Sequence, residues 1–275
     1  MKASEFVAAY AGKGLATCER EALNQIAEGG LAQPPSLEVP VQIPPSAGQA
    51  GHTGSFFAVG DYLAIGEPGD YLRIPLTPRN AQRVADLFSV QLPTRKMVDA
   101  IYAAAPVKVE LGGEVPNKGA DLNQYLAHSR KMDDAIVREG GMLPGSLLAG
   151  GAPLGAGVRP VAGGMKDVVV APNMPAGKVL IYGWHHKDGS HTQPFSYVHS
   201  AEYVDYSHGV RLISPNMIVD GRETTVAEVL ADPVLSKLLS DQGPVVRPRY
   251  GKPPPSFGGE ALSYGEMLAR LRALG

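Results

Sequence analysis

The chain has 275 residues and a formal net charge of -2, with charges of both signs spread along its length. This length is ample to bury a hydrophobic core, and the charge pattern offers neither a basic surface for nucleic acid nor a polybasic membrane segment. No stretch approaches the roughly 18 uninterrupted apolar residues of a membrane span. We therefore expect a soluble chain with no nucleic-acid partner and no membrane span.

The single cysteine, Cys18, cannot form an internal disulfide, so the fold requires no oxidising compartment. Cys18 follows the apolar spacing of its helix and is expected to be a small buried residue rather than a nucleophile. Residues 1–6 lack the long apolar segment of an export signal. The sequence as given predicts a cytoplasmic protein, or an exported one if a signal peptide was removed.

Glycine and proline are abundant: 33 glycines and 24 prolines make up about a fifth of the chain, against a usual share of roughly 12%. This composition predicts a loop-rich protein, with loops or linkers where these residues cluster. We predict three parts, namely N-terminal helices with a Pro/Gly-rich lead-in (1–54), a main α+β domain holding the site (55–242), and a Pro-rich tail with a C-terminal helix (243–275).

The first half of the chain alternates between helical and strand patterns. Ser4 is expected to cap the first of one or two helices, and a proline-rich connection over 34–45 follows. Capping residues before apolar periodicity then predict helices that begin after Thr77, Thr94 and Asp121. The predicted ranges are helices within 4–28, a β-hairpin of 56–65 with 70–74, and helices at 78–88, 95–105 and 122–139.

The second half is richer in β-branched residues, which favour buried strands. Thr225 is expected to cap a helix that continues past Pro233 to Leu239. A last helix over 262–274 carries an apolar stripe that could dock on the body or join a homo-oligomer. The predicted strands cover 167–170, 178–182, 208–213 and 216–219, with tight turns at 187–189 and 220–221. Together these elements predict an α+β fold with a mixed or antiparallel sheet and amphipathic helices.

Five of the seven histidines lie between His185 and His208, the stretch that also holds the only tryptophan, Trp184. Side chains that move protons or bind metals are therefore concentrated there. Residues 198–209 carry the strongest group, because imidazole, carboxylate and hydroxyl groups lie close enough to orient one another. Its candidate members are His199, Tyr203, Asp205, Ser207 and His208.

Strand alternation limits how this group can cooperate. In an extended chain Tyr203, Asp205 and Ser207 share one face and His208 lies on the other, so Asp205 and His208 can meet only if the chain turns between them. The alternative interpretation is a set of satisfied, half-buried polar residues at the end of a strand.

Two further groups are candidates. His185 follows an apolar strand and can project into a cleft, whereas His186 and His191 are more easily a solvated turn pair. Trp184 could stack on a ligand or belong to the core. Lys166 and Asp167 enter an apolar strand, where they could form an ion pair, an anion-binding cation or part of a proton relay.

Several standard catalytic and binding motifs are absent from the sequence, which limits the reactions to consider. The glycines before Lys166 do not form a phosphate-binding loop, and the G-x-S-x-G elbow of serine hydrolases is absent. Histidines with Asp205 could hold zinc or iron, but there is no H-E-x-x-H, no H-x-H and no cysteine pair. No cofactor follows from the sequence, and a metal stays an open alternative.

Four sequence blocks resemble those of an uncharacterised bacterial protein family. They are LPTRKMVD at 92–99, KDVV at 166–169, IYGWH at 181–185 and DYSHGVRL at 205–212. The resemblance covers roughly residues 55–242 and implies that the four blocks belong to one domain. No activity is carried over from it.

The leading hypothesis is a hydrolase that acts on a peptide or cell-wall-derived amide. His199 or His208 would be the general base, Asp205 its orienting partner, and Ser207 a nucleophile or hydrogen-bond donor, while Lys166 or Arg211 would clamp an anionic group. His185, Asp167, Tyr203 and Trp184 complete the candidate residues. The alternatives are a non-catalytic glycan- or peptide-binding module, a His-ligated metalloenzyme, and an assembly protein that recruits a subunit through its C-terminal helix.

Overall fold

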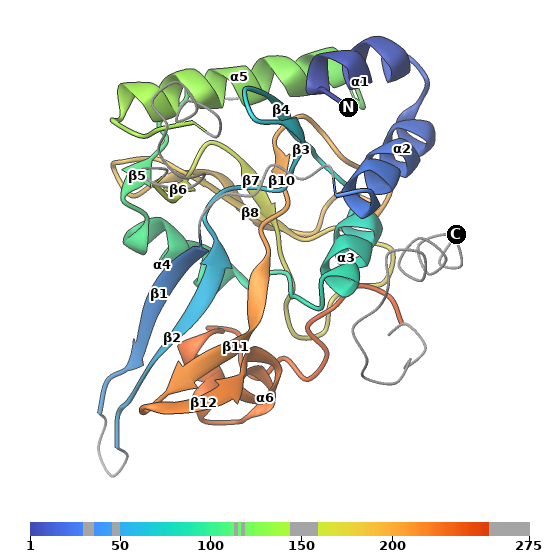
Figure 1. Cartoon of the computed structure of the whole chain (residues 1–275). Helices are drawn as coiled ribbons and strands as arrows, with labels where there is room; N and C mark the ends of the chain where they lie inside the picture. The colour runs from blue at the N-terminus through green and yellow to red at the C-terminus, as the bar shows by residue number, and fades with distance from the viewer. Residues whose placement is uncertain (30–35, 46–49, 113–114, 117–118, 144–158, 253–275) are drawn as a thin grey trace.

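A computed structural model describes residues 1–29, 36–45, 50–112, 115–116, 119–143 and 159–252. The fold is α+β, as the sequence predicts (Figure 1). Within these ranges no helix has the length and apolar composition needed to cross a membrane. The helices are α1 (Ala3–Tyr10), α2 (Leu15–Ala27), α3 (Pro78–Leu87), α4 (Arg95–Ala104), α5 (Leu122–Arg138) and α6 (Val226–Ala231), with a 3-10 helix, η2, at Leu235–Leu238.

One sheet is antiparallel and has the strand order β1-β2-β11-β12. It runs from the middle of the molecule to α6 at one end (Figure 1). Phe56 of β2 and Met217 of β11 are register partners, and both are buried in the core beneath α4 and α6. Its strands are β1 (Ser36–Ile43), β2 (His52–Val59), β11 (Ile213–Val219) and β12 (Arg222–Thr225).

The second four-stranded sheet is mixed, in the order β10-β7-β8-β9. β7 pairs in parallel with β10 and antiparallel with β8. Its strands are β7 (Lys166–Val168), β8 (Ile181–His185), β9 (His191–Ser196) and β10 (His208–Gly209). Two smaller pairs complete the described strands: the hairpin β3 (Ala64–Glu67) with β4 (Asp70–Arg73), and β5 (Val107–Lys108) with β6 (Val161–Ala162).

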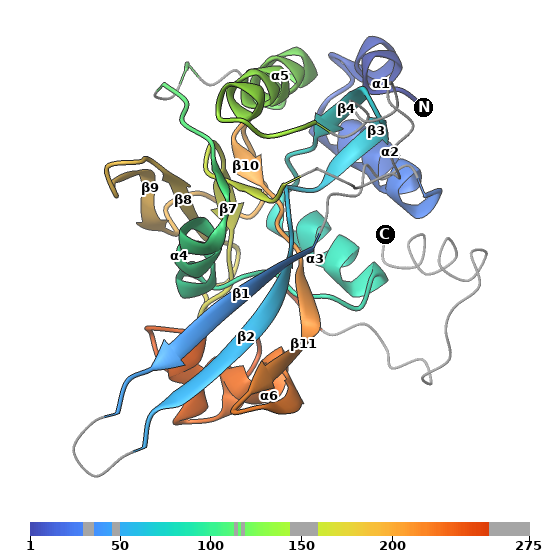
Figure 2. The ribbon, with the colours of Figure 1, turned by 60° about the vertical axis from the view of Figure 1, so that its left-hand side comes forward.

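Helices cover both faces of the mixed sheet. On one face Val168, Ile181 and Trp184 belong to a core cluster with apolar residues of α1, α2, α3 and α5. On the other face Val98 of α4 packs with Tyr182, and Figure 2 shows α4 against β7 and β8. Polar groups on the two faces are therefore separated by the sheet itself.

Several predicted elements agree closely with the structure. Thr94 caps α4 by accepting a hydrogen bond from the amide of Met97 at 3.2 Å, and Thr225 accepts one from Glu228 at 3.1 Å. Asp121 caps α5 through the amides of Asn123 and Gln124. The turn at 220–221 also forms as the sequence predicts. The predicted hairpin of 56–65 with 70–74 forms in part: residues 64–67 pair with 70–73, whereas 56–59 belong to β2 in the other sheet. Local hydrogen bonds decide these ends, so local sequence suffices to find them.

Other elements differ from the prediction. β1 lies within the segment 34–45 that the sequence predicts as a connection, because Pro40 is tolerated on an edge strand. Ser4 does not cap α1, which begins at Ala3, and its hydroxyl bonds to Asp70 instead. β9 is not among the predicted strands, and its first residue, His191, was expected in a solvated turn. α6 ends at Ala231, two residues before Pro233. The predicted helix at 262–274 lies outside the described residues.

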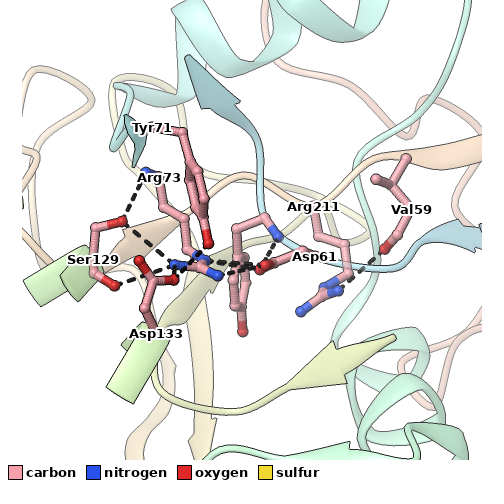
Figure 3. A network of polar contacts seen from close by, with 8 residues as sticks. Val59, Asp61, Tyr71, Arg73, Ser129, Asp133 and Arg211 are labelled. Carbon is pink, nitrogen blue, oxygen red and sulfur yellow. Dashed lines mark hydrogen bonds and ion pairs between the residues drawn. The ribbon is translucent and has the colours of Figure 1, made fainter. Parts of the chain in front are cut away.

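An ion network joins β4 to α5 (Figure 3). The guanidinium of Arg73, 1% exposed, bonds to both carboxylate oxygens of Asp61 and to Asp133 at 2.8 Å. It also donates to the carbonyl of Ser129 at 3.2 Å, and Tyr71 donates to Asp133 at 2.7 Å. Because each charge has partners of the opposite sign, burial of the arginine is tolerated.

Candidate functional site

The parallel pair of β7 and β10 brings two of the predicted groups together. Lys166 is the register partner of His208, and Asp167 is the partner of Gly209. Register partners on neighbouring strands share a face, while successive residues of one strand alternate between faces. Lys166 and His208 therefore lie on one face of the mixed sheet, and Asp167 lies on the other.

Asp205 anchors the turn that leads into β10. Its carbonyl accepts a hydrogen bond from the amide of His208 at 3.2 Å, so the chain does bend between these residues. One carboxylate oxygen accepts from the Ser207 amide and hydroxyl at 2.9 and 2.7 Å. The other accepts from Tyr203 at 3.0 Å and lies 3.4 Å from the Lys166 ammonium. Residues of two predicted groups, Lys166 of one and Tyr203 and Ser207 of the other, thus meet around one carboxylate.

The carboxylate of Asp205 is held in its ionised form. Burial by itself raises the pKa of Asp205, but His208, Lys166 and the two bonds from Ser207 outweigh it and lower that pKa to about 2. Because both of its oxygens already accept hydrogen bonds, Asp205 fixes its neighbours in place and is not itself a proton acceptor near neutral pH.

His208 is fully buried, yet within the described part of the chain neither ring nitrogen has a hydrogen-bond partner. Its ring meets that of Tyr203 edge-on at 5.5 Å, and His199 stacks on Tyr203 at 3.9 Å. Burial lowers the pKa of His208 to about 4, against the opposing charge of Asp205. The imidazole is therefore neutral at neutral pH and carries a lone pair that no group among the described residues uses.

Ser207 differs from a serine nucleophile in its surroundings. Its hydroxyl is fully buried and donates to Asp205, not to a histidine. Of the two roles that the sequence leaves open, this geometry fits the hydrogen-bond donor that orients Asp205.

The opposite face of the sheet carries Asp167 and Arg211. The Arg211 guanidinium lies 3.6 Å from the Asp167 carboxylate and 4.1 Å from the centre of the Tyr62 ring. Burial raises the pKa of Asp167 to about 6, although Arg211 and His185 oppose the shift. Gly209 is needed here because an added Cβ would lie 2.4 Å from the Tyr62 ring. Asp167 and Arg211 are thus buried away from His208.

His185 also lies apart from His208, because β8 has a bulge. Gly183 and Trp184 have positive φ values of 108° and 54°, and the register with β9 shifts at this point. The bulge turns Trp184 into the core on the His208 face and leaves His185 on the face of Tyr182. Unbroken alternation along the strand would have placed His185 on the His208 face and Trp184 on the face of Tyr182.

His185 belongs to a second His–carboxylate pair, which the sequence reasoning missed. Its Nε2 lies 2.8 Å from Asp99, which also accepts a hydrogen bond from Tyr182 at 2.8 Å. The ring stacks on Tyr102 at 4.6 Å, and His191 lies 5.8 Å away. Asp99 ends the block 92–99, and only the packing of α4 on β8 reveals its partner.

His186 was expected in a solvated turn, but it contacts two side chains. Its Nδ1 lies 2.8 Å from Glu110, and its Nε2 lies 2.8 Å from the Thr192 hydroxyl. Among the described residues, no group of three or more His, Cys, Asp or Glu side chains is arranged to hold a metal ion. The zinc or iron alternative therefore gains no support from this part of the chain.

Trp184 lines a cavity of about 400 Å³. The indole is 2% exposed and its N–H has no hydrogen-bond acceptor in the described structure. His128 packs 5.3 Å from Trp184 and 4.9 Å from Tyr206, so three rings form one wall. The lining residues are Glu110, Leu111, Gly112, Val115, His128, Lys131, Asp134, Arg138, Trp184 and Tyr206.

No family model matches this chain, and neither the curated proteins nor the solved structures include a significant match. The resemblance of its four sequence blocks to a bacterial family therefore stays a prediction. Its functional assignment depends on the geometry described above.

Proposed function

We propose that the chain is a hydrolase that cleaves an amide in a peptide or cell-wall-derived substrate, with His208 as the general base. The observation that carries the proposal is the buried, neutral imidazole of His208, whose two nitrogens have no partner in the described structure beside an ionised Asp205. A buried polar group without a hydrogen bond is costly, and a catalytic role is one reason for which such a group is kept.

In the proposed reaction, water attacks the amide carbonyl carbon while His208 accepts the water proton, giving a tetrahedral intermediate. The imidazolium then returns that proton to the leaving nitrogen as the carbon–nitrogen bond breaks. Asp205 stabilises the transient imidazolium, and the Lys166 ammonium supplies positive charge for the developing oxyanion. Ser207 keeps Asp205 oriented through its two hydrogen bonds.

Access to His208 is part of the proposal. Tyr203 and His199 are both half-buried and stacked, and Tyr203 contacts the His208 ring. We infer that this pair of rings covers His208 and moves aside when substrate enters. Arg211 has no role in the reaction because it lies on the opposite face of the sheet.

The test is turnover of a panel of peptide amides and cell-wall muropeptides by the wild type and by His208→Gln. General-base catalysis contributes about 10²- to 10⁴-fold, so His208→Gln should lose about that much of kcat/KM. His52→Gln is the matched control, because His52 bonds to Asp220 in the other sheet. Thermal melts of both variants check folding. Turnover that survives unchanged in folded His208→Gln would refute the proposal.

Ser207→Ala separates the two roles of the serine. A nucleophilic serine would cost about 10⁶-fold in kcat when removed, whereas a positioning residue should cost far less. We expect a loss of about tenfold, with the acid limb of the pH–rate profile shifted toward lower pH, because a misoriented Asp205 raises the pKa of His208 less. Restoring the hydroxyl with Ser207→Thr should recover part of the rate.

The non-catalytic binding module is the second candidate, favoured by the aromatic wall of the cavity beside Trp184. Saturable ligand binding without turnover by any panel substrate would support it. Stoichiometric zinc or iron in the purified protein would instead support the metalloenzyme. The assembly hypothesis depends on the helix predicted at 262–274, which lies outside the described residues.

A further inference from the structure

His185 and His191 form a cross-strand pair at the edge of the mixed sheet. They are register partners on β8 and β9, and β9 is the last strand of that sheet (Figure 2). Directly opposed residues of an antiparallel pair point to the same face, with Cβ atoms about 4.5–5.5 Å apart. The centres of the two imidazole rings lie 5.8 Å apart. Two imidazoles are therefore held side by side, on the face of the sheet that is turned away from His208.

The tautomer of His185 is set by Asp99. The Nε2 atom lies 2.8 Å from a carboxylate oxygen, which accepts hydrogen bonds, so Nε2 carries the proton and Nδ1 keeps its lone pair in the neutral ring. Among the described residues Nδ1 has no hydrogen-bond partner, and it is not buried. Gly183 leaves it uncovered, because a Cβ at that position would contact Nδ1 at 3.5 Å. His185 thus presents an open acceptor nitrogen.

His191 completes the pair. It is half-buried, and neither of its ring nitrogens has a hydrogen-bond partner within the described part of the chain. Its ring packs 5.0 Å from that of Tyr182, whose hydroxyl donates to Asp99 at 2.8 Å. The guanidinium of Arg95 is paired with Asp241, so the charge of Asp99, whose side chain is 48% exposed, is available to offset a cation.

This arrangement matches the surroundings of a metal-binding histidine, in which one ring nitrogen is held by a carboxylate while the other coordinates the ion. Imidazole suits zinc, copper and nickel, with a zinc–nitrogen distance of about 2.0–2.1 Å. Rotation of the His191 side chain brings a nitrogen within reach of an ion bound to its neighbour. No third His, Cys, Asp or Glu side chain of the described residues converges on the pair, so water completes the coordination.

We propose that His185 and His191 bind a divalent late transition-metal ion such as Zn²⁺ or Cu²⁺, and that Asp99 orients His185 for it. His185 coordinates through Nδ1. The two-ligand site is not the catalytic centre of the metalloenzyme alternative, and it does not rest on the proposed hydrolase, because it lies on the face opposite His208. Mg²⁺ prefers oxygen ligands and should not bind.

Zinc titration by calorimetry is the first test, with untagged, chelator-treated protein at slightly alkaline pH, because only a neutral imidazole binds a metal. The wild type should take up Zn²⁺ saturably, and Mg²⁺ should give no binding heat. His191→Gln removes one ligand, and Asp99→Asn keeps an acceptor oxygen but removes the charge. Each should weaken the dissociation constant about tenfold or more.

The matched control is His52→Gln, because His52 also lies beside an aspartate, Asp220, but in the other sheet. It should bind Zn²⁺ as tightly as the wild type does. Thermal melts check that each variant is folded. His191 is the safer ligand to replace, because it is half-buried on an edge strand, whereas His185 is buried.

Copper supplies a second readout, which a purely structural effect of the substitutions would not produce. The electron paramagnetic resonance spectrum of the Cu²⁺ complex should show coupling to two imidazole nitrogens in the wild type and to one in His191→Gln. Absence of saturable Zn²⁺ uptake would overturn the proposal. So would equal Zn²⁺ affinity in the wild type and in folded His191→Gln, or fewer than two coupled nitrogens in the wild-type spectrum.

Discussion

Replacing Arg73 by methionine should destabilise the fold more than any exposed charge substitution. Arg73 is 1% exposed and bonds to Asp61 and Asp133, whose side chains are 10% and 18% exposed (Figure 3). Methionine keeps an unbranched side chain of similar length but removes the guanidinium. Two largely buried carboxylates and the Ser129 carbonyl would then lose this donor, and the bond from Tyr71 would not neutralise the charge of Asp133.

Removing one partner of a buried ion pair costs about 3–5 kcal/mol, because the remaining charge stays buried and unpaired. We expect a loss in this range for Arg73→Met, a large share of the roughly 5–15 kcal/mol that holds a domain folded. Arg73→Lys keeps the charge but has one nitrogen in place of the planar fork that reaches both carboxylates. It should cost about 1–3 kcal/mol.

Urea unfolding at neutral pH measures these losses as changes in midpoint at constant slope. Arg20→Met is the matched control, because Arg20 pairs with Glu21 at the surface with 64% of its side chain exposed. It should change stability by less than about 0.5 kcal/mol. A double-mutant cycle adds Asp61→Asn, and the coupling should reach about 1–3 kcal/mol. A cost below about 1 kcal/mol for Arg73→Met, or strictly additive losses, would refute this account of the network.

Three further predictions concern the stability contributions of His208, of Gly209 beside it and of the N-cap of α6. The pKa of His208 falls to about 4 when the protein folds, so the unfolded chain takes up the proton first and stability is lost as the pH falls below about 6.5. The wild type should lose about 2 kcal/mol more than His208→Gln between about pH 7 and pH 5, measured by urea unfolding, and identical losses would contradict this. Gly209→Ala should cost about 1–3 kcal/mol by overpacking, because its Cβ would meet the Tyr62 ring at 2.4 Å; an unchanged melting temperature would show that the ring can move. Thr225→Ala removes the N-cap of α6 and the bond to the Glu228 amide and should cost about 1 kcal/mol, whereas Thr225→Ser should restore most of it.

The local sequence was sufficient to predict those helix starts and turns that are formed by hydrogen bonds between residues close together in the chain. Thr94, Asp121 and Thr225 each cap the helix that follows them, and the hairpin at 64–73 closes as its turn residues require. β1 shows the limit of this reasoning. Pro40 suggests a connection when it is considered alone, but on an edge strand the missing amide proton costs no sheet hydrogen bond.

For the candidate site, the sequence by itself determined the residue types and one geometric condition. It concentrated His199, Tyr203, Asp205 and Ser207 near His208, and strand alternation required a turn before His208 could approach Asp205. The turn forms, because the Asp205 carboxylate and carbonyl bind the amides that follow them. Both the need for this turn and the hydrogen bonds that form it involve residues close together in the sequence.

Only the tertiary structure decided which distant groups share a face. The parallel pairing of β7 with β10 sets Lys166 beside His208 and sends Asp167 to the opposite side. The bulge at Gly183 separates His185 from the tryptophan next to it and gives it Asp99 as a partner from α4. Register and strand pairing depend on long-range contacts that no local pattern specifies, so the sequence determined the groups present while the sheet determined which of them meet.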